Sequence, residues 1–176
     1  QKHACYNNYS TPVFQNPILL GADIVMHSTT KYLGGHSDIL GGALICKKAD
    51  DFWQRIKMIQ HVGGAVPSPF DTYLLTRSIK TLAYRMKGHA EHAGIIAEYL
   101  FQHPQIEEVC YPGLKSHKNH QVAASQMSGF GGMLSFLVKG GAAEADEVIS
   151  KLKYFTNATS LGGVESLVER RAAVEG

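Results

Sequence analysis

A lysine lies between hydroxyl residues and a glycine-rich turn in the segment from His27 to Gly35. The apolar run directly before this segment, residues 22–26, predicts a buried strand. Side chains two residues apart lie on the same side of an extended chain, so the hydroxyls of Ser28 and Thr30 can face one anion. Lys31 follows at the start of the turn, where its amine can form a Schiff base with a carbonyl compound. This combination predicts a site for an aldehyde that carries a phosphate group.

Other interpretations of these residues stay open at this stage. A lysine after a strand is usually a solvated surface charge, and Ser28 and Thr30 could bind a phosphate-bearing ligand without covalent chemistry. A metal site is also conceivable, because His27, His36 and Asp38 lie near one another in the sequence. Two or three ligands on one loop rarely complete a zinc site without a fourth. We therefore expect no metal, and expect these side chains to hydrogen-bond to the loop backbone.

The order of residues 28–38, Ser-x-Thr-Lys-Tyr-x-x-Gly-His-x-Asp, resembles the cofactor-lysine motif of the cystathionine synthase and lyase family. The members of this family are the pyridoxal-phosphate enzymes of cysteine and methionine metabolism. The resemblance implies that Lys31 binds pyridoxal 5'-phosphate covalently and is the catalytic residue that moves protons on the substrate. It also implies that Ser28 and Thr30 bind the phosphate of the cofactor.

Three further stretches extend the resemblance over nearly the whole chain from Thr11 onward. Residues 65–74 resemble the family segment that follows the helix after the cofactor lysine, and residues 80–86 resemble the start of the linker helix. Residues 160–167, Ser-Leu-Gly-Gly-Val-Glu-Ser-Leu, resemble the loop that meets the substrate carboxylate. The resemblance assigns that substrate contact to Ser160.

The chain departs from the family pattern at two places. Relatives carry an aspartate six residues before the proline that matches Pro12, and this aspartate pairs with the pyridine nitrogen of the cofactor. Tyr6 stands there instead and supplies no carboxylate to keep the nitrogen protonated and the ring an electron sink. Relatives also carry an Arg-x-Ser segment that holds the substrate carboxylate, which Arg170 and Arg171 do not match. We therefore expect a piece of a longer member, with part of the site supplied by a second subunit.

The composition is that of an ordinary globular protein, with 176 residues, 44% hydrophobic and 18% charged, and a net charge of +2. The absence of a basic run with interleaved aromatic residues argues against a nucleic-acid partner. No apolar stretch approaches the roughly 20 residues of a membrane helix, which argues against a membrane partner. The three cysteines are far apart and predict neither disulfides nor a zinc knuckle. A reducing, cytoplasmic compartment fits these features best.

The first half of the chain must form the elements that position this lysine. We expect a strand over residues 21–31 and a second over residues 43–46, either antiparallel to the first or elsewhere in the sheet, because parallel neighbours need a longer crossover. Residues 49–61 predict a helix with an aspartate cap and a glycine stop. Residues 71–103 predict an almost continuous helical run that ends at Pro104 and suits a connector between two domains.

The second half changes its pattern to short alternating elements. Residues 108–111, 131–138 and 153–159 predict strands, and residues 121–127 and 142–152 predict helices. Strands that alternate with helices are typical of a small α/β domain.

The predicted fold class is therefore α/β, in three parts. We expect residues 1–85 to form the end of the large pyridoxal-phosphate domain of a fold-type I enzyme and residues 86–104 to form a linker helix. Residues 105–176 are then the start of the small C-terminal α/β domain.

The resemblance implies β- or γ-elimination, or γ-replacement, on cystathionine, homoserine esters or related sulfur amino acids. It also implies a homo-oligomer, which is a homotetramer in the family. Many lyases and synthases of the family carry an acidic residue where this chain has Thr159, so the choice among γ-synthase, γ-lyase and β-lyase stays open. The alternative function is a catalytically inactive fragment that acts only as an assembly or interaction module, and Tyr6 supports this alternative.

Overall fold

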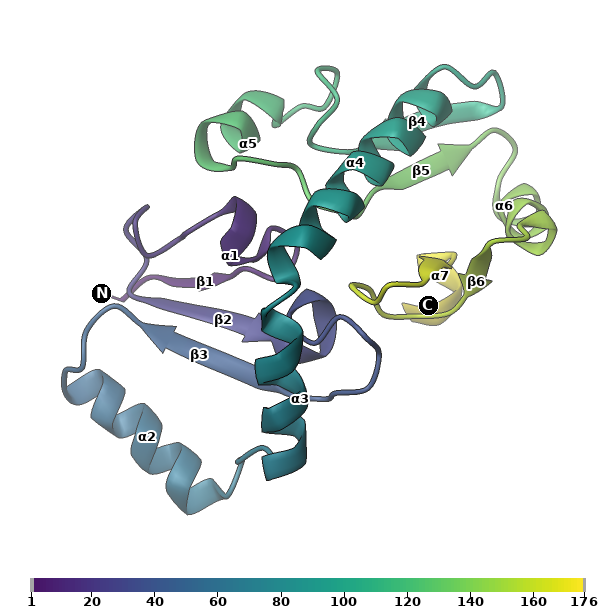
Figure 1. The fold of residues 1–176 in the computed structure, drawn as a ribbon. Coiled ribbons are helices and arrows are strands. Elements are labelled where there is room, and N and C mark those ends of the chain that lie inside the picture. The colour runs from purple at the N-terminus through teal and green to yellow at the C-terminus, as the bar shows by residue number, and fades with distance from the viewer. Residues whose placement is uncertain (1, 176) are drawn as a thin grey trace.

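A long central helix, α4 (Leu82–Phe101), organises the protein, for which a computed structural model describes residues 2–175. This helix runs between a three-stranded sheet on one side and two small two-stranded sheets on the other (Figure 1). Strands and helices alternate along most of the chain, so the predicted α/β class is confirmed.

The three-stranded sheet has the order β1 (Ala4–Tyr6), β2 (Ile24–Ser28), β3 (Gly42–Cys46). β1 pairs with β2 in parallel, whereas β3 pairs with β2 antiparallel, as predicted for a strand so close in sequence. The strand predicted over residues 21–31 corresponds to β2, and its predicted end at residue 31 is wrong. The strand ends at Ser28, because residues Thr29–Leu33 coil into a π-helical turn, η1.

Local capping sets the helices of the first half, which are α1 (Thr11–Phe14), α2 (Asp51–Gly63) and α3 (Pro69–Ile79). The predicted aspartate cap of α2 is Asp50, whose carboxylate accepts a hydrogen bond from the Trp53 amide at 3.2 Å. Gly64, at a φ of 71°, ends this helix in the left-handed conformation that glycine adopts readily. The predicted cap and stop of α2 are therefore confirmed.

The helix α4 has other bounds than the helix predicted over residues 86–104. It runs from Leu82 to Phe101 and is separated from α3 by a turn at residues 80 and 81. The reason is local, since the amides of Lys80 and Thr81 bond three residues back to Arg77 and Ser78, and Thr81 leaves helical geometry.

The second half contains the predicted alternation of short elements. They are β4 (Ile106–Cys110), α5 (His120–Gln126), β5 (Ser135–Val138), α6 (Ala142–Lys151), β6 (Phe155–Asn157), β7 (Ser166–Val168) and α7 (Arg171–Glu175). β4 and β5 pair antiparallel, while β6 and β7 pair in parallel. The elements of the structure that the sequence analysis did not predict include β1, η1, β7 and α7.

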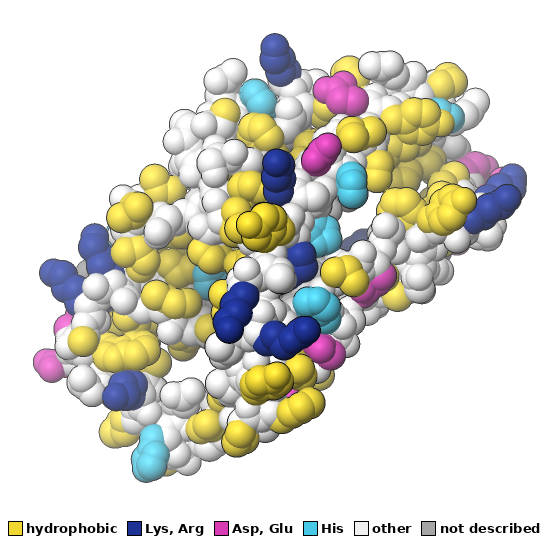
Figure 2. Space-filling view, viewed as in Figure 1, with side chains coloured by type: hydrophobic (Ala, Val, Ile, Leu, Met, Phe, Trp, Pro, Cys, Tyr) yellow, Lys and Arg dark blue, Asp and Glu magenta, His cyan; other side chains and the backbone are white. Residues whose placement is uncertain are grey.

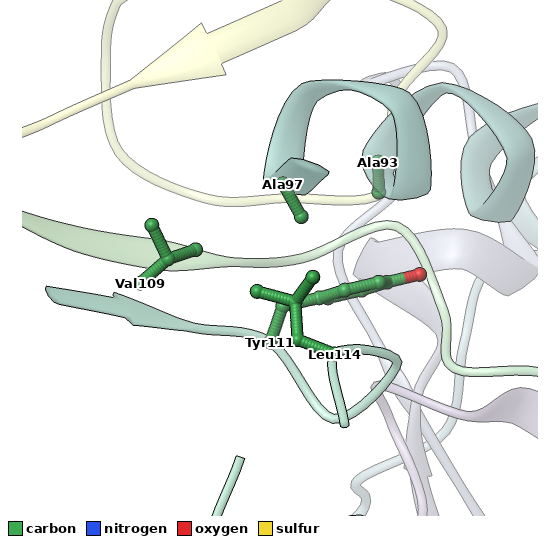
Figure 3. Packing of buried hydrophobic residues seen from close by; sticks show 5 residues of the cluster. All are labelled: Ala93, Ala97, Val109, Tyr111 and Leu114. Atoms are coloured by element: carbon green, nitrogen blue, oxygen red, sulfur yellow. The ribbon is translucent and has the colours of Figure 1, made fainter. Parts of the chain in front are cut away.

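The helix α4 contributes to two hydrophobic clusters. In the first, Ala93 and Ala97 of α4 face Val109, Tyr111 and Leu114, which come from β4 and the loop after it (Figure 3). The second cluster joins Leu82 and Met86 at the start of α4 to Tyr32 of η1, and Met86 has no exposed surface. Because α4 is shared, it fixes the position of the lysine turn relative to the second half of the chain.

Much apolar surface remains exposed, and apolar side chains are visible over many elements in Figure 2. Large exposed side chains on α2, α3 and the loop between them are Met58, Ile59, Val62, Val66, Phe70 and Tyr73. Within residues 2–175, no helix has the length and apolar character needed to cross a membrane.

Candidate functional site

The π-helical turn η1 places Lys31 directly after β2. The backbone leaves helical geometry at Lys31, where ψ is −136°, and the Gly34 amide closes the turn by donating to the Thr29 carbonyl at 2.9 Å. The Gly35 amide donates to the Lys31 carbonyl at 2.8 Å.

The amine of Lys31 meets a residue from the far end of the chain. Its Nζ donates a hydrogen bond to Oγ of Ser160 at 2.8 Å, across 129 positions of sequence. Ser160 has a φ of 87°, an uncommon left-handed conformation for a residue other than glycine. The two residues that the sequence assigned to the cofactor and the substrate are therefore neighbours in space.

The loop that carries Ser160 packs closely against the lysine turn. A side chain at Gly162, whose φ is 88°, would bring its Cβ to 2.4 Å from the Tyr32 amide nitrogen and 2.7 Å from the Lys31 carbonyl carbon. The far end of the loop is held by a short hydrogen bond from the Ser37 hydroxyl to the Glu165 carboxylate. This bond is the main cause that lowers the pKa of Glu165. Because a Cβ at position 162 would clash with the backbone of Lys31 and Tyr32, the loop can approach the lysine turn this closely only with glycine there.

Ser28 and Thr30 do not share one extended segment. The prediction that both hydroxyls lie on one side of a strand is therefore wrong. Ser28 ends β2, and its amide donates to Oδ1 of Asn8 at 2.7 Å. Thr30 lies inside η1, and its Oγ1 accepts a hydrogen bond from the Gly41 amide at 3.1 Å. Asn8 was not predicted as a site residue. It is a buried polar residue shortly after β1, and burial cannot be seen in the sequence.

Tyr32, the residue after Lys31, packs into the core beneath the turn and holds it there. Its side chain is only 2% exposed, and burial raises the pKa of its phenol to about 12. The ring of His89, on α4, packs against it edge to face with the ring centres 5.1 Å apart. Burial, and then the charge of Arg85, lower the pKa of His89. An aromatic contact with α4 therefore fixes the residue next to Lys31.

The positions that depart from the family pattern lie elsewhere around the site. Tyr6 ends β1 opposite Met26 of β2 and is 51% exposed. Arg170 pairs with Asp146 of α6 through two hydrogen bonds, at 2.7 and 3.0 Å. The guanidinium of Arg170 is thus occupied by a carboxylate of its own chain.

Of the side chains expected to bond to the loop backbone, His36 does so, whereas Nδ1 of His27 is buried without a hydrogen-bond partner from residues 2–175. Nδ1 of His36 lies 2.8 Å from the Gly34 carbonyl oxygen. Among the residues that the structure describes, no group of three or more histidine, cysteine and acidic side chains could hold a metal ion.

Comparison with known proteins decides the family. The model of the Cys/Met metabolism PLP-dependent enzymes matches residues 4–175. This chain belongs to that family. The predicted resemblance to cystathionine synthases and lyases is therefore confirmed, and the family depends on pyridoxal phosphate.

Individual relatives of the Cys/Met metabolism family agree. The chain is 51% identical over 168 residues to cystathionine gamma-synthase of Mycobacterium leprae, covering 96% of this chain and 43% of the relative. It is 48% identical over 163 residues to cystathionine gamma-lyase of Dictyostelium discoideum, covering 93% of this chain and 42% of the relative. The chain thus spans less than half the length of these curated relatives.

A solved structure shares the fold. Cystathionine gamma synthase from Xanthomonas oryzae pv. oryzae, in complex with aminoacrylate and cysteine, superposes with a TM-score of 0.94 at 42% identity. The match covers 98% of this chain and 44% of that chain.

The donor set around Lys31 fits the pyridoxal phosphate on which the family depends. Ser28 and Thr30 both precede the lysine, within three residues of it, and carry hydroxyl donors suited to a phosphate, while Lys31 carries an amine suited to an aldehyde. The Thr30 hydroxyl oxygen accepts from the Gly41 amide at 3.1 Å, and its hydrogen is donated to the Gly41 carbonyl at 3.5 Å. A bound phosphate would compete with this carbonyl for the hydroxyl hydrogen. The amine of Lys31 is held at the surface of η1 by the Ser160 hydroxyl.

Proposed function

We propose that this chain is part of a pyridoxal-phosphate-dependent enzyme that performs β- or γ-elimination, or γ-replacement, on cystathionine or a related sulfur amino acid. The observation that carries the proposal is the 2.8 Å hydrogen bond between Nζ of Lys31 and Oγ of Ser160. It brings the cofactor-lysine motif and the loop assigned to the substrate carboxylate into contact. The names of the relatives, which are synthases and lyases of cystathionine, support the substrate class.

Each residue of this chain has a role in the proposal. Ser28 and Thr30 would bind the phosphate of the cofactor, and Lys31 would bind its aldehyde. Bound pyridoxal phosphate supplies an electron sink that makes the α-hydrogen of an amino acid acidic. After the substrate amine has replaced Lys31 at the aldehyde, the freed Nζ would take that proton from the α-carbon and return a proton to the substrate. Ser160 would orient the substrate by donating to its carboxylate, and its Oγ lies within hydrogen-bond distance of the free Nζ.

The family membership also supports a proposal for the assembly and the location. We propose a homo-oligomer, in which a second copy completes the site, because the described chain leaves large apolar side chains exposed. The three cysteines are unpaired, which supports a reducing, cytoplasmic compartment.

A second candidate function is favoured by Tyr6. Without a carboxylate at this position, the chain would bind the cofactor weakly and could act as an inactive assembly module. The two candidates differ in whether Lys31 reacts with the cofactor in preference to other lysines.

Site-specific labelling tests the proposal. The purified protein is incubated with pyridoxal phosphate, reduced with borohydride and digested for peptide mapping. We expect the label at Lys31 at cofactor concentrations that leave the other lysines unmodified, and no selective label in Lys31→Ala. Labelling spread evenly over the exposed lysines, such as Lys57 and Lys87, would contradict the proposal.

A further inference from the structure

Arg85 joins three segments around the lysine turn. Its Nη1 donates to the Tyr32 carbonyl at 2.7 Å, its Nη2 donates to the Ser78 carbonyl at 2.9 Å, and its Nε donates to Oγ1 of Thr81 at 3.1 Å. The three acceptors belong to η1, to the last turn of α3 and to the residue before α4. One guanidinium therefore links the residue next to Lys31 to two helices.

These contacts reach carbonyl groups at helix ends. The Ser78 carbonyl also accepts from the Thr81 amide at 3.2 Å and the Thr81 hydroxyl at 3.1 Å, so Arg85 adds a charged donor to it. A charged donor binds a carbonyl more strongly than a neutral one. A guanidinium offers donors in a rigid planar fork, so it can bind the Tyr32 and Ser78 carbonyls at once in one fixed geometry. An ammonium group at the same place would lack this fork.

The backbone makes room for this side chain. Gly35 has a φ of 68°, and a Cβ added there would lie 2.0 Å from Nη1 of Arg85. Leu82 and Met86, on either side of Arg85 in α4, are buried against Tyr32. The guanidinium thus lies between Gly35, where a side chain would clash with it, and the packed helix α4.

We propose that Arg85 is a positioning residue for Lys31. By holding the Tyr32 carbonyl, it fixes the backbone that follows Lys31 and so directs the amine toward Ser160. The inference rests on the proposed function, because it assigns to Arg85 the task of presenting the lysine that binds the cofactor.

The labelling assay at Lys31 measures this effect in the full chain. The quantity compared is the pyridoxal phosphate concentration that gives half-maximal label at Lys31. We expect this concentration to rise about tenfold or more in Arg85→Met, because a hydrogen bond to a charged group contributes on the order of a tenfold change or more. Arg85→Lys should give an intermediate rise. Arg77→Met, which removes an exposed arginine of α3, is the matched control and should not change the value.

Chemical rescue separates positioning from a general folding defect. Arg85→Ala leaves space for a free guanidinium ion, so added guanidinium at low concentration should restore selective labelling of Lys31. Amide hydrogen exchange gives a readout without cofactor: the Gly34 and Gly35 amides, which close the turn, should exchange faster in Arg85→Met. The Gly64 amide, which bonds to Gln60 at the end of α2, should exchange at an unchanged rate.

The possible outcomes are distinct. Equal half-maximal concentrations in the unmodified chain and in Arg85→Met would overturn the role of Arg85 and leave the proposed function standing. No selective label at Lys31 in the unmodified chain would overturn the proposed function and this inference together. If Arg85→Met does not fold, a folded Arg85→Lys that labels as the unmodified chain does would also overturn it.

Discussion

The residues that surround Lys31 come from distant parts of the chain. Its amine is held by Ser160, the preceding strand is tied to Asn8 through the Ser28 amide, and the following residue is held by Arg85. Each of these contacts joins groups that are far apart in the sequence, so the surroundings of Lys31 depend on the tertiary structure.

Tyr6 provides a test of the enzyme against the inactive module. If it stands beside the pyridine nitrogen, a phenol replaces the carboxylate that would stabilise the charged ring, and turnover should be very slow. Tyr6→Asp should raise the release of keto acid from cystathionine by about tenfold or more, since each ~1.36 kcal/mol changes a rate tenfold.

The matched control for this change is Tyr9→Asp. Tyr9 is 52% exposed, close to the 51% of Tyr6, and it lies three residues further along the same segment. An unchanged rate in Tyr6→Asp, together with brisk turnover by the unmodified chain, would show that another group pairs with the nitrogen.

The buried phenol of Tyr32 predicts a loss of stability at high pH. Its pKa is raised by burial from an ordinary value near 10 to about 12. As the pH rises from 10 to 12, the unfolded phenol loses its proton while the folded one keeps it, so the free energy of unfolding falls. The fall attributable to this group is roughly 2 kcal/mol by pH 12. Denaturant unfolding at several pH values should show a smaller fall in Tyr32→Phe, and equal falls would contradict the assignment.

At the scale of elements, the loop at residues 160–165 and the turn η1 act as one unit. They meet where Gly162 packs on the backbone of Lys31 and Tyr32, and the contact between Ser37 and Glu165 holds the other end of the loop. A backbone atom cannot move aside as a side chain can, so this meeting point tolerates no added volume.

Gly162→Ala should weaken the packing of the loop at residues 160–165 against η1. We expect a fall in the free energy of unfolding of about 1–3 kcal/mol from overpacking, and weaker selective labelling of Lys31. Gly94→Ala is the control, because a Cβ at this position in α4 meets no atom within 4 Å. Alanine there should stabilise the helix by about 0.5–1 kcal/mol. Chemical denaturation of both variants would measure the difference, and equal effects would refute the close contact.

At the scale of the whole molecule, the exposed apolar side chains of α2 and α3 predict self-association. Apolar patches beyond a few hundred Å² usually mark interfaces or sites of aggregation. Sedimentation velocity should show a mass that rises with protein concentration, and Ile59→Lys with Val62→Lys should reduce this rise. Tyr154→Lys, at a highly exposed position outside this surface, is the control. A strictly monomeric profile of the unmodified chain at high concentration would contradict the prediction.

The sequence alone determined the family, the α/β class and most of the elements. These features depend on local patterns: the cofactor-lysine motif, the apolar period of α6, the Asp50 cap and the Gly64 stop of α2. Caps and periodicities act within a few residues, so they can be recognised without knowledge of the rest of the chain.

Only the tertiary structure decided how the site is assembled. The sequence predicted an extended backbone through Lys31, but hydrogen bonds from Gly34 and Gly35 coil it into a π-helical turn. The sequence suggested separate roles for Lys31 and Ser160, whereas the fold makes them partners across 129 residues. Arg85 gave no sequence signal of its role, because its acceptors are backbone carbonyls, which every residue carries. Contacts between distant backbone and side-chain groups depend on packing around α4, and no local pattern encodes that packing.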